Sequence, residues 1–309
     1  MSQRDGRQNE VTDGKEDWFP SIWGNDDEIG ALNFINSSKL LRSLKKTVKL
    51  GQAYSLSQPL EYGIPVHWFN GPFLHTTFRN HTASSKLYSN AKNKFAAMST
   101  RMELSDHTGT HIDALNHVSI GGILYNGQIA ETITGTFGTE KLGIDKVPPI
   151  ISRGIHIDIT SIRGGNILPI EYLISPDDIE LILEKKKIGI EEGDVVLIST
   201  GWDLLWMKDN DKYGGPCPGI GLAAADWLVE RKVALVGSDT WKVEIHPPEL
   251  KDEAASVHQF LIAKNGVMLI ENMNLQELRK NMITEFLFIC LPLKLKGGAG
   301  SPVNPIAIV

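Results

Sequence analysis

The order of apolar and polar positions along the chain predicts alternating strands and helices. Short apolar segments rich in Val, Ile and Phe, each bounded by charged residues, Gly or Pro, are typical of buried strands. Residues 63–80 contain Gly, Asn and Pro and predict an irregular loop, and residues 297–309 read as a Gly-rich tail. We predict strands at residues 48–60, 98–104, 150–159, 195–199, 233–236, 267–270 and 286–293.

Helices are predicted between several of these strands. The best defined has Ser175 as N-cap, Pro176 in its first turn, a basic last turn at 185–187 and Gly189 beyond its end. This order suits the helix dipole and the backbone preferences of Pro and Gly. Two more helices are predicted, one at 222–229 and one at about 252–264. The pattern as a whole favours a mixed α/β domain.

The domain organisation is simple. Residues 1–17 are almost all polar or Gly and offer no apolar face, so they predict a disordered tail. No internal repeat and no Ser/Gly linker divides the remainder. We therefore expect a single domain at 18–309.

Composition and charge exclude several functional classes. The chain has 309 residues, 41% of them hydrophobic, and a formal net charge of −6. No apolar stretch approaches the roughly 20 residues of a membrane span, and the N-terminus lacks a signal-peptide pattern. The two cysteines suggest neither a disulfide framework nor a zinc ribbon, and the mild acidity argues against nucleic acid. We expect a cytoplasmic protein that acts on a small molecule.

The segment from 107 to 117 carries the candidate chemistry. It reads His-Thr-Gly-Thr-His-Ile-Asp-Ala-Leu-Asn-His, so His107, His111, Asp113 and His117 share one face of an extended chain. Two neutral imidazoles and a carboxylate can hold a divalent metal and leave a position open for water or substrate. His117 lies farther along, where we expect a base behind the ligands. The alternative is a solvent-exposed polar strand without a metal.

Three other polar residues lie in apolar segments. His258 shares a predicted helix face with apolar residues, a pattern more typical of a core histidine than of a ligand. Glu271 follows the predicted strand 267–270 on its apolar face, where a carboxylate needs a partner. An Arg would satisfy Glu271 as well as a metal, so the residues leave one metal or two open. His156, in the middle of a predicted strand, is interpreted as structural.

The motif at 107–117 resembles the signature of the cyclase family of metal-dependent hydrolases, which includes kynurenine formamidase and isatin hydrolase. The resemblance covers residues 18–309. One difference is Leu115, which stands where many members have Pro; this position affects the backbone and leaves the ligand set intact. Other segments resemble further blocks of the family: Trp23–Asn33, Gly237–Thr240, the segment around His258, Glu271–Leu275 and Gly297–Pro305.

The resemblance implies a swivelling β/β/α fold and a role for each candidate residue. The implied metal ligands are His107, His111 and Asp113, the implied proton-transfer group is His117, and the residues that complete the site as ligands or catalytic groups are His258 and Glu271. A second metal can bind there, and both Mn²⁺ and Zn²⁺ accept such ligands. The resemblance also implies a homodimer with an N-terminal arm at 18–48, of which residues 18–36 help to close the pocket.

The predicted activity is hydrolysis of an amide or lactam C–N bond in a small cyclic or aromatic compound by a metal-activated water. A leaving nitrogen must be protonated, which suits a nearby histidine. Two alternatives stay open: a lactone or ester hydrolase that uses the same site, and a non-catalytic metal-binding protein of this fold. Trp68, Phe69 and Trp202 are candidates to line a pocket for a flat substrate, although Trp202 is spaced like a core residue.

Overall fold

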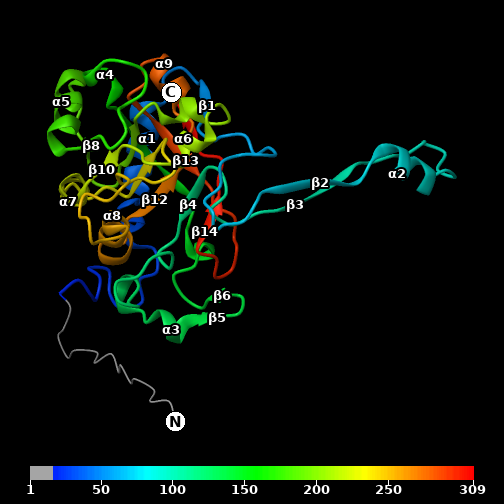
Figure 1. Ribbon diagram of the computed structural model, residues 1–309, viewed down its shortest axis with the longest axis horizontal. Coiled ribbons are helices and arrows are strands. Elements are labelled where there is room, and N and C mark those ends of the chain that lie inside the picture. Colours follow the sequence, from blue (N-terminus) through cyan, green and yellow to red (C-terminus); the bar gives the residue numbers. More distant parts are fainter. Residues whose placement is uncertain (1–16) are drawn as a thin grey trace, which may run out of the picture.

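One mixed sheet of nine strands forms the centre of the protein in the computed structural model, which describes residues 17–309 (Figure 1). The strand order is β1-β15-β13-β7-β9-β11-β12-β4-β14. The strands β7, β9, β11 and β12 pair in parallel, and both flanks pair antiparallel. The mixed α/β prediction is confirmed. The bounds are β1 (Ala53–Ser55), β4 (His111–Asp113), β7 (Ile150–Asp158), β9 (Val195–Ser199), β11 (Leu235–Ser238), β12 (Met268–Glu271), β13 (Glu285–Cys290), β14 (Gly300–Pro302) and β15 (Ile306–Ile308).

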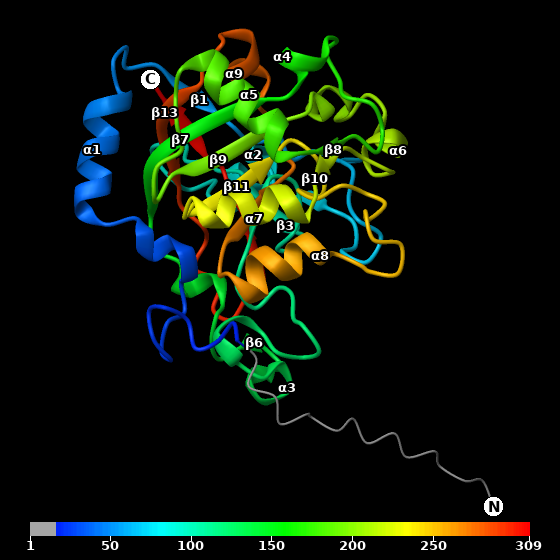
Figure 2. The same cartoon turned by 90° about the vertical axis from the view of Figure 1, so that its left-hand side faces the viewer.

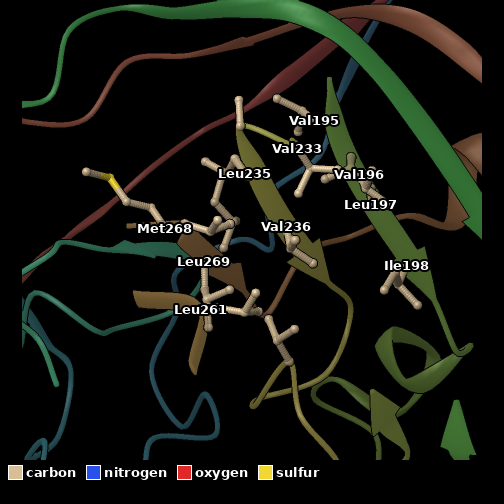
Figure 3. Packing of buried hydrophobic residues seen from close by; sticks show 14 of the residues in the cluster. Val195, Val196, Leu197, Ile198, Val233, Leu235, Val236, Leu261, Met268 and Leu269 are labelled. Atoms are coloured by element: carbon tan, nitrogen blue, oxygen red, sulfur yellow. The ribbon is translucent and has the colours of Figure 1, made fainter. Parts of the chain in front are cut away.

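The parallel strands form the core of the sheet. All residues of β9, β11 and β12 are buried, as expected for short, nearly continuous apolar runs in a sheet that is covered on both faces. Figure 3 shows side chains of these strands, among them Leu197, Val236 and Leu269, packed with Leu261. Burial of apolar area stabilises a fold by about 25 cal/mol per Å², so this layer holds the strands that carry the site in place.

Three helices pack beside these strands: α5 (Pro176–Lys186), α7 (Leu222–Glu230) and α8 (Ser256–His258), which continues into the π-helix η5 (Gln259–Lys264). Figure 2 shows α7 and α8 in front of the sheet, and α7 also packs on α5. The predicted start of α5 is confirmed by a capping box, in which the Ser175 and Asp178 side chains each accept from the other's backbone N–H. The helix predicted from 252 begins only at Ser256, because Ala255 adopts a left-handed conformation with φ of +56°.

The edges of the sheet differ from the sequence prediction. Residues 48–60 contain only the short strand β1, which follows helix α1 (Ser37–Thr47), and the strand predicted at 286–293 ends at Cys290. The Gly-rich tail supplies two strands of the main sheet. Strand β14 pairs with β4, and β15 pairs with both β1 and β13. These partners lie far apart in the sequence, so local periodicity does not reveal them.

The N-terminal segment packs against the body of its own chain. The Tyr125 hydroxyl donates to the Asp27 carboxylate at 2.6 Å, and the Ala31 N–H donates to Gly266 O at 2.8 Å. In the 3-10 helix η1 (Gly30–Phe34), φ of Gly30 is +56° and a Cβ would lie 2.2 Å from Gly266 O. The segment predicted as an arm is thus folded onto its own body, and its reach to a neighbour stays a prediction. The tail predicted at 1–17 lies outside the described residues except for Asp17.

One segment leaves the body of the protein. Strand β2 (Leu74–Arg79), helix α2 (His81–Leu87) and strand β3 (Ser99–Glu103) form a long extension that projects from the rest of the chain (Figure 1). The two strands pair antiparallel with each other, outside the main sheet. We call residues 74–103 the projecting arm. The irregular loop predicted at 63–80 therefore gives way to strand at Leu74, whereas the strand predicted at 98–104 corresponds to β3.

The other elements are short and connect those above. They are η2 (Tyr125–Gly127), α3 (Ala130–Ile133), β5 (Thr134–Gly135), β6 (Gly138–Thr139), η3 (Ile144–Lys146), α4 (Thr160–Arg163), β8 (Leu173–Ile174), η4 (Trp202–Leu205), α6 (Asn210–Tyr213), β10 (Gly219–Ile220) and α9 (Gln276–Lys280). Between residues 17 and 309, none of the helices has the length and apolar character needed to span a bilayer.

Candidate metal centre

The candidate site forms where β4 lies between β12 and β14. In the sheet register, His111 is opposite Glu271 of β12, and Asp113 is opposite Gly300 of β14. Strand alternation places His111 and Asp113 on one face of β4. His111 Nε2 lies 3.4 Å from Asp113 Oδ1 and 3.6 Å from Glu271 Oε2. Three candidate ligands therefore come from two adjacent strands.

His107 reaches the same place through a turn. The prediction of one extended segment from 107 to 117 is wrong, because only His111–Asp113 are strand. The chain bends at Gly109, where φ is +64° and a Cβ would lie 2.3 Å from the Leu60 side chain. His107 Nε2 nevertheless lies 3.3 Å from Asp113 Oδ1. The predicted convergence of these side chains is present, but it results from a turn.

His117 lies among the candidate ligands. The centroid of its ring is 4.2 Å from that of His107. One ligand atom from each of His107, Asp113 and His117 lies within 4.8 Å of the others. The sequence placed His117 behind the ligands, whereas the structure gives it a position from which it can either bind a metal or exchange a proton with a molecule in the site.

Asp113 is the residue that a cation would satisfy. It is 1% exposed, and neither carboxylate oxygen accepts a hydrogen bond from the described part of the chain. The Nε2 atoms of His107 and His111 lie 3.3 and 3.4 Å from Asp113 Oδ1, in ion-pair contacts outside hydrogen-bond geometry. A buried carboxylate whose oxygens receive no hydrogen bond is costly unless positive charge lies beside it. The chemistry of this donor set therefore fits a divalent metal.

Asp113 also belongs to a second group of donor atoms. With His111 and Glu271 it supplies three ligand atoms within 4.8 Å of one another, in addition to the group with His107 and His117. Imidazole and carboxylate ligands suit Zn²⁺ and Mn²⁺. The shared carboxylate is the arrangement that a bridging ligand needs, so the donor atoms accommodate one ion or two.

Asp106 and the C-terminal segment hold His107 in place. Asp106 Oδ1 lies 2.8 Å from His107 Nδ1, and its other oxygen accepts from the backbone N–H groups of Ala299 and Gly300 at 3.0 and 3.2 Å. A Cβ on Gly300 would lie 3.0 Å from His107 Nε2 and 2.8 Å from Ile112 O. The glycine permits the close approach of β14 to the candidate ligands.

Glu244 holds His258 from the other side. Glu244 Oε1 lies 2.5 Å from His258 Nδ1, and His258 Nε2 lies 3.1 Å from Glu271 Oε1. The Glu271 carboxylate also accepts from the Val243 N–H at 2.8 Å. His258 stands at the junction of α8 with the π-helix, and single π turns occur often at functional sites. The structure thus brings His258 and Glu271 to the site, as the resemblance implied.

Sequence reasoning missed Asp106 and Glu244. Asp106 immediately precedes the motif and offers only its proximity as a signal. Around Glu244, polar residues alternate with apolar ones at 242–246, which is the pattern of a half-buried extended segment. That alternation gives no indication that the carboxylate meets His258, which lies on a different element.

The carboxylates and the burial of the site set its pKa values. Burial alone would lower the pKa of His107, but Asp106 and Asp113 outweigh it and raise this pKa to about 10. In the same way Glu244 and Glu271 outweigh burial and raise the pKa of His258 to about 10. Burial lowers the pKa of His117 to about 4. The cluster thus favours positive charge beside its carboxylates, and a bound cation supplies such charge.

The predicted substrate-binding aromatics fall into two environments. Trp68 and Phe69 are exposed. The centroid of the His67 ring lies 4.0 Å from that of Phe69 and 5.4 Å from that of Trp241. Trp202 is 0% exposed and its indole N–H donates to Tyr213 O at 3.1 Å. Trp202 is therefore in contact with the core and not with the surface, as its spacing suggested.

His156 is satisfied within the core. Its Nδ1 lies 2.9 Å from Ile283 O and its Nε2 lies 2.9 Å from Ser199 Oγ. Burial lowers its pKa to about 4, so the ring is neutral at pH 7. The structural interpretation of this residue is confirmed.

Comparisons with known proteins agree with the motif and the fold. The Cyclase family model matches residues 54–245, more than half of the chain. The chain belongs to the Cyclase family. It is 26% identical over 220 residues to Cyclase-like protein 3 of Oryza sativa subsp. japonica, across 70% of this chain and 68% of that protein. It is 25% identical over 214 residues to isatin hydrolase of Roseibium aggregatum, across 67% of this chain and 73% of that protein.

A solved structure extends the likeness beyond the region that the family model matches. The crystal structure of a novel cyclase is 30% identical and superposes with a TM-score of 0.85, over 93% of this chain and 98% of the other. The protein therefore has the fold of the cyclase-family metal-dependent hydrolases. The family and the fold predicted from the sequence are both confirmed.

Proposed function

We propose that the protein hydrolyses an amide or lactam C–N bond of a small cyclic or aromatic compound with the help of a bound divalent metal, Mn²⁺ or Zn²⁺. The observation that carries this proposal is the buried Asp113 carboxylate, which has no hydrogen-bond partner in the described chain and is surrounded by histidines. A structural role would leave such a carboxylate hydrogen-bonded.

The residues that would hold the metal are Asp113 together with His107 and His117, or with His111 and Glu271. When bound, a divalent metal polarises a carbonyl group and lowers the pKa of water toward about 7. The chain fixes these ligands beforehand: Asp106 orients His107, the Gly109 carbonyl lies 2.8 Å from His111 Nδ1, and the Val243 N–H orients Glu271. Residues behind metal ligands that orient them in this way increase metal affinity.

We assign proton transfer to two histidines of this cluster, His117 and His258. Hydrolysis of a C–N bond needs a group that accepts a proton from water and returns one to the departing nitrogen. His117 has no side-chain hydrogen bond that ties it elsewhere in the described chain, so its ring is free for this exchange unless it binds the metal. His258, already in contact with both Glu244 and Glu271, is the second group that can hold a proton.

Two observations support a flat substrate with an amide bond. The exposed rings of Trp68 and Phe69, with His67 and Trp241 beneath them, offer aromatic surface on which a planar compound can stack. Isatin, which gives one relative its name, is an aromatic lactam. We therefore favour an aromatic lactam or amide over an aliphatic one.

The experiment combines metal analysis with a substrate panel. Metal content is measured for the purified protein. Turnover is measured on a lactam and the lactone of equal ring size, and on an amide and the matching ester. His111→Ala is expected to lose bound metal and turnover together, whereas the matched control His81→Ala, on the projecting arm, is expected to keep both. A His111→Ala protein that retains metal and turnover contradicts the proposal. Faster turnover of the lactone and ester series would favour the alternative C–O chemistry.

A further inference from the structure

Lys242 places a cation beside the candidate metal centre. Its side chain is 16% exposed, and its Nζ atom lies 3.3 Å from Glu244 Oε1. This ion pair is outside hydrogen-bond geometry, and in the described chain the ammonium group donates no hydrogen bond. An ammonium group has three N–H donors, and leaving them unused in a largely buried position is costly. The donors of Lys242 are therefore available to a bound molecule.

Glu244 does not occupy this ammonium group. Its two carboxylate oxygens already contact His258 Nδ1 at 2.5 Å and the Val257 N–H at 3.1 Å. The ring of His258 in turn reaches Glu271 Oε1 through its Nε2 at 3.1 Å. Two side chains thus link Lys242 to Glu271, so the unused donors lie next to the candidate metal centre without belonging to its ligand set.

Two imidazole rings flank the neighbouring residue, Trp241. The centroid of the Trp241 ring lies 5.4 Å from that of His67 and 5.2 Å from that of His246. The indole N–H donates to Gly215 O at 2.8 Å, which fixes the ring. The Nδ1 atoms of both histidines are buried and have no hydrogen-bond partner in the described chain. We call His67, Trp241, Lys242 and His246 the Lys242 cluster.

The charge of Lys242 acts on both imidazole rings. Burial and this charge lower the pKa of His67 and of His246, so both rings are neutral at pH 7 and each offers one N–H donor. The Lys242 cluster therefore combines a positive charge, N–H donors and aromatic surface. A carboxylate on a flat ring matches all three properties, because it is negative, accepts hydrogen bonds and is attached to a group that can stack.

We propose that the Lys242 cluster binds a carboxylate group of the substrate, so that the amide or lactam which the protein hydrolyses is an aromatic acid. This inference rests on the proposed function, because the same molecule must also reach the metal centre. The ring stacks on Trp241 and the carboxylate accepts from Lys242 Nζ, while the C–N bond lies toward Asp113. One hydrogen bond to a charged group corresponds to about 10–100-fold in affinity.

The first test compares matched substrates. Turnover is measured on formanilides that carry either a carboxylate or a carboxamide at the same ring position, with ortho, meta and para compounds in turn. The wild type is expected to prefer at least one carboxylate compound to its carboxamide. In Lys242→Met, kcat/KM for that carboxylate should fall about 10–100-fold, mainly through KM, whereas kcat/KM for the carboxamide should stay the same.

Two further variants complete this comparison. Lys242→Arg keeps the positive charge and should keep most of the preference. Lys232→Met, which removes an exposed lysine paired with Glu192, is the control and should behave like the wild type. Equal losses on both compounds in Lys242→Met would mean that the lysine only balances Glu244, and this outcome overturns the proposal. A wild type without any preference for a carboxylate also overturns it.

A binding measurement separates this inference from the proposed function. Ligand-observed NMR gives the dissociation constants of benzoate and benzyl alcohol, which contain no bond to hydrolyse, for the Zn²⁺-loaded and the chelator-treated protein. We expect benzoate to bind more tightly than benzyl alcohol in both preparations and to lose this advantage in Lys242→Met. If the wild type shows this pattern but hydrolyses no compound, the proposed function fails and the carboxylate site stands. Benzoate binding that needs Zn²⁺ and is unchanged in Lys242→Met overturns the inference.

Discussion

Glu244 and His258 form a contact of 2.5 Å between Oε1 and Nδ1, and both side chains are buried. The opposite nitrogen of the same ring lies 3.1 Å from Glu271 Oε1. Glu244 therefore fixes the ring orientation of His258 and the position of the carboxylate that faces His111. Groups behind a metal site that orient its residues in this way increase metal affinity.

Removing the charge of Glu244 is expected to weaken the metal site without unfolding the protein. Glu244→Gln keeps the shape of the side chain but no longer balances the His258 ring, so metal affinity should fall about 10–100-fold. Metal titration followed by the thermal shift measures this change. Glu192→Gln, which alters an exposed ion pair with Lys232, is the matched control. Equal affinities for the two variants and the wild type would show that Glu244 has no part in the site.

Asp113→Asn should separate metal binding from folding. Burial would raise the pKa of Asp113, but attraction to His117, His107 and His111 outweighs burial and holds this pKa below its usual value, so Asp113→Asn removes a stabilising charge together with the shared ligand. Without metal, the variant is therefore expected to melt at or below the temperature of the wild type. With metal at about 100 times its Kd, only the wild type should gain about 2.7 kcal/mol. The exposed Asp226→Asn should behave like the wild type, and metal-dependent stabilisation of Asp113→Asn would contradict this account.

A single methyl group at Gly300 is expected to disturb the site. In Gly300→Ala the added Cβ would lie 2.8 Å from Ile112 O and 3.0 Å from His107 Nε2, so β14 or His107 must move. We expect at least a tenfold loss of metal affinity, because ligand geometry is sensitive to small displacements. Gly189→Ala adds the same group where no atom lies within 4 Å and is the control. Unchanged metal binding in Gly300→Ala would mean that β14 can shift without moving the candidate ligands.

Asp178 should make the stability of the protein depend on pH in the acidic range. Burial would raise its pKa, but hydrogen bonds from Ser175, Arg163 and Tyr172 outweigh burial and hold the pKa below its usual value. The ionised carboxylate therefore stabilises the folded state above its unfolded pKa of about 3.9, and this contribution is lost as the pH falls through the folded value.

The comparison uses two adjacent carboxylates. Asp178→Asn is expected to cost about 1–2 kcal/mol at pH 7, and the difference from wild type should shrink below pH ~4. Denaturant unfolding at several pH values measures it. Asp177→Asn, in the same helical turn but exposed, should cost much less. A difference for Asp178→Asn that is independent of pH would argue against a role for its charge.

The parts of the fold that depend on residues close together in the sequence were predictable. The capping box of α5 and the buried strand β9 follow from residues within a few positions of each other, because local backbone preference and side-chain alternation act over that range. The strands β14 and β15 were not predicted, because each has only three residues in a Gly-rich and Pro-rich tail and exists through pairing with distant strands: β14 with β4, and β15 with β1 and β13.

The sequence by itself determined the ligand types of the site: His107, His111, Asp113 and His117 are close in the chain, and their chemistry indicates a metal. Only the tertiary structure decided how they meet, because a turn at Gly109 and not an extended strand brings His107 to Asp113. It also decided that Glu271 faces His111 and that Glu244 supports His258, since sheet pairing and helix packing join elements that local periodicity treats as independent.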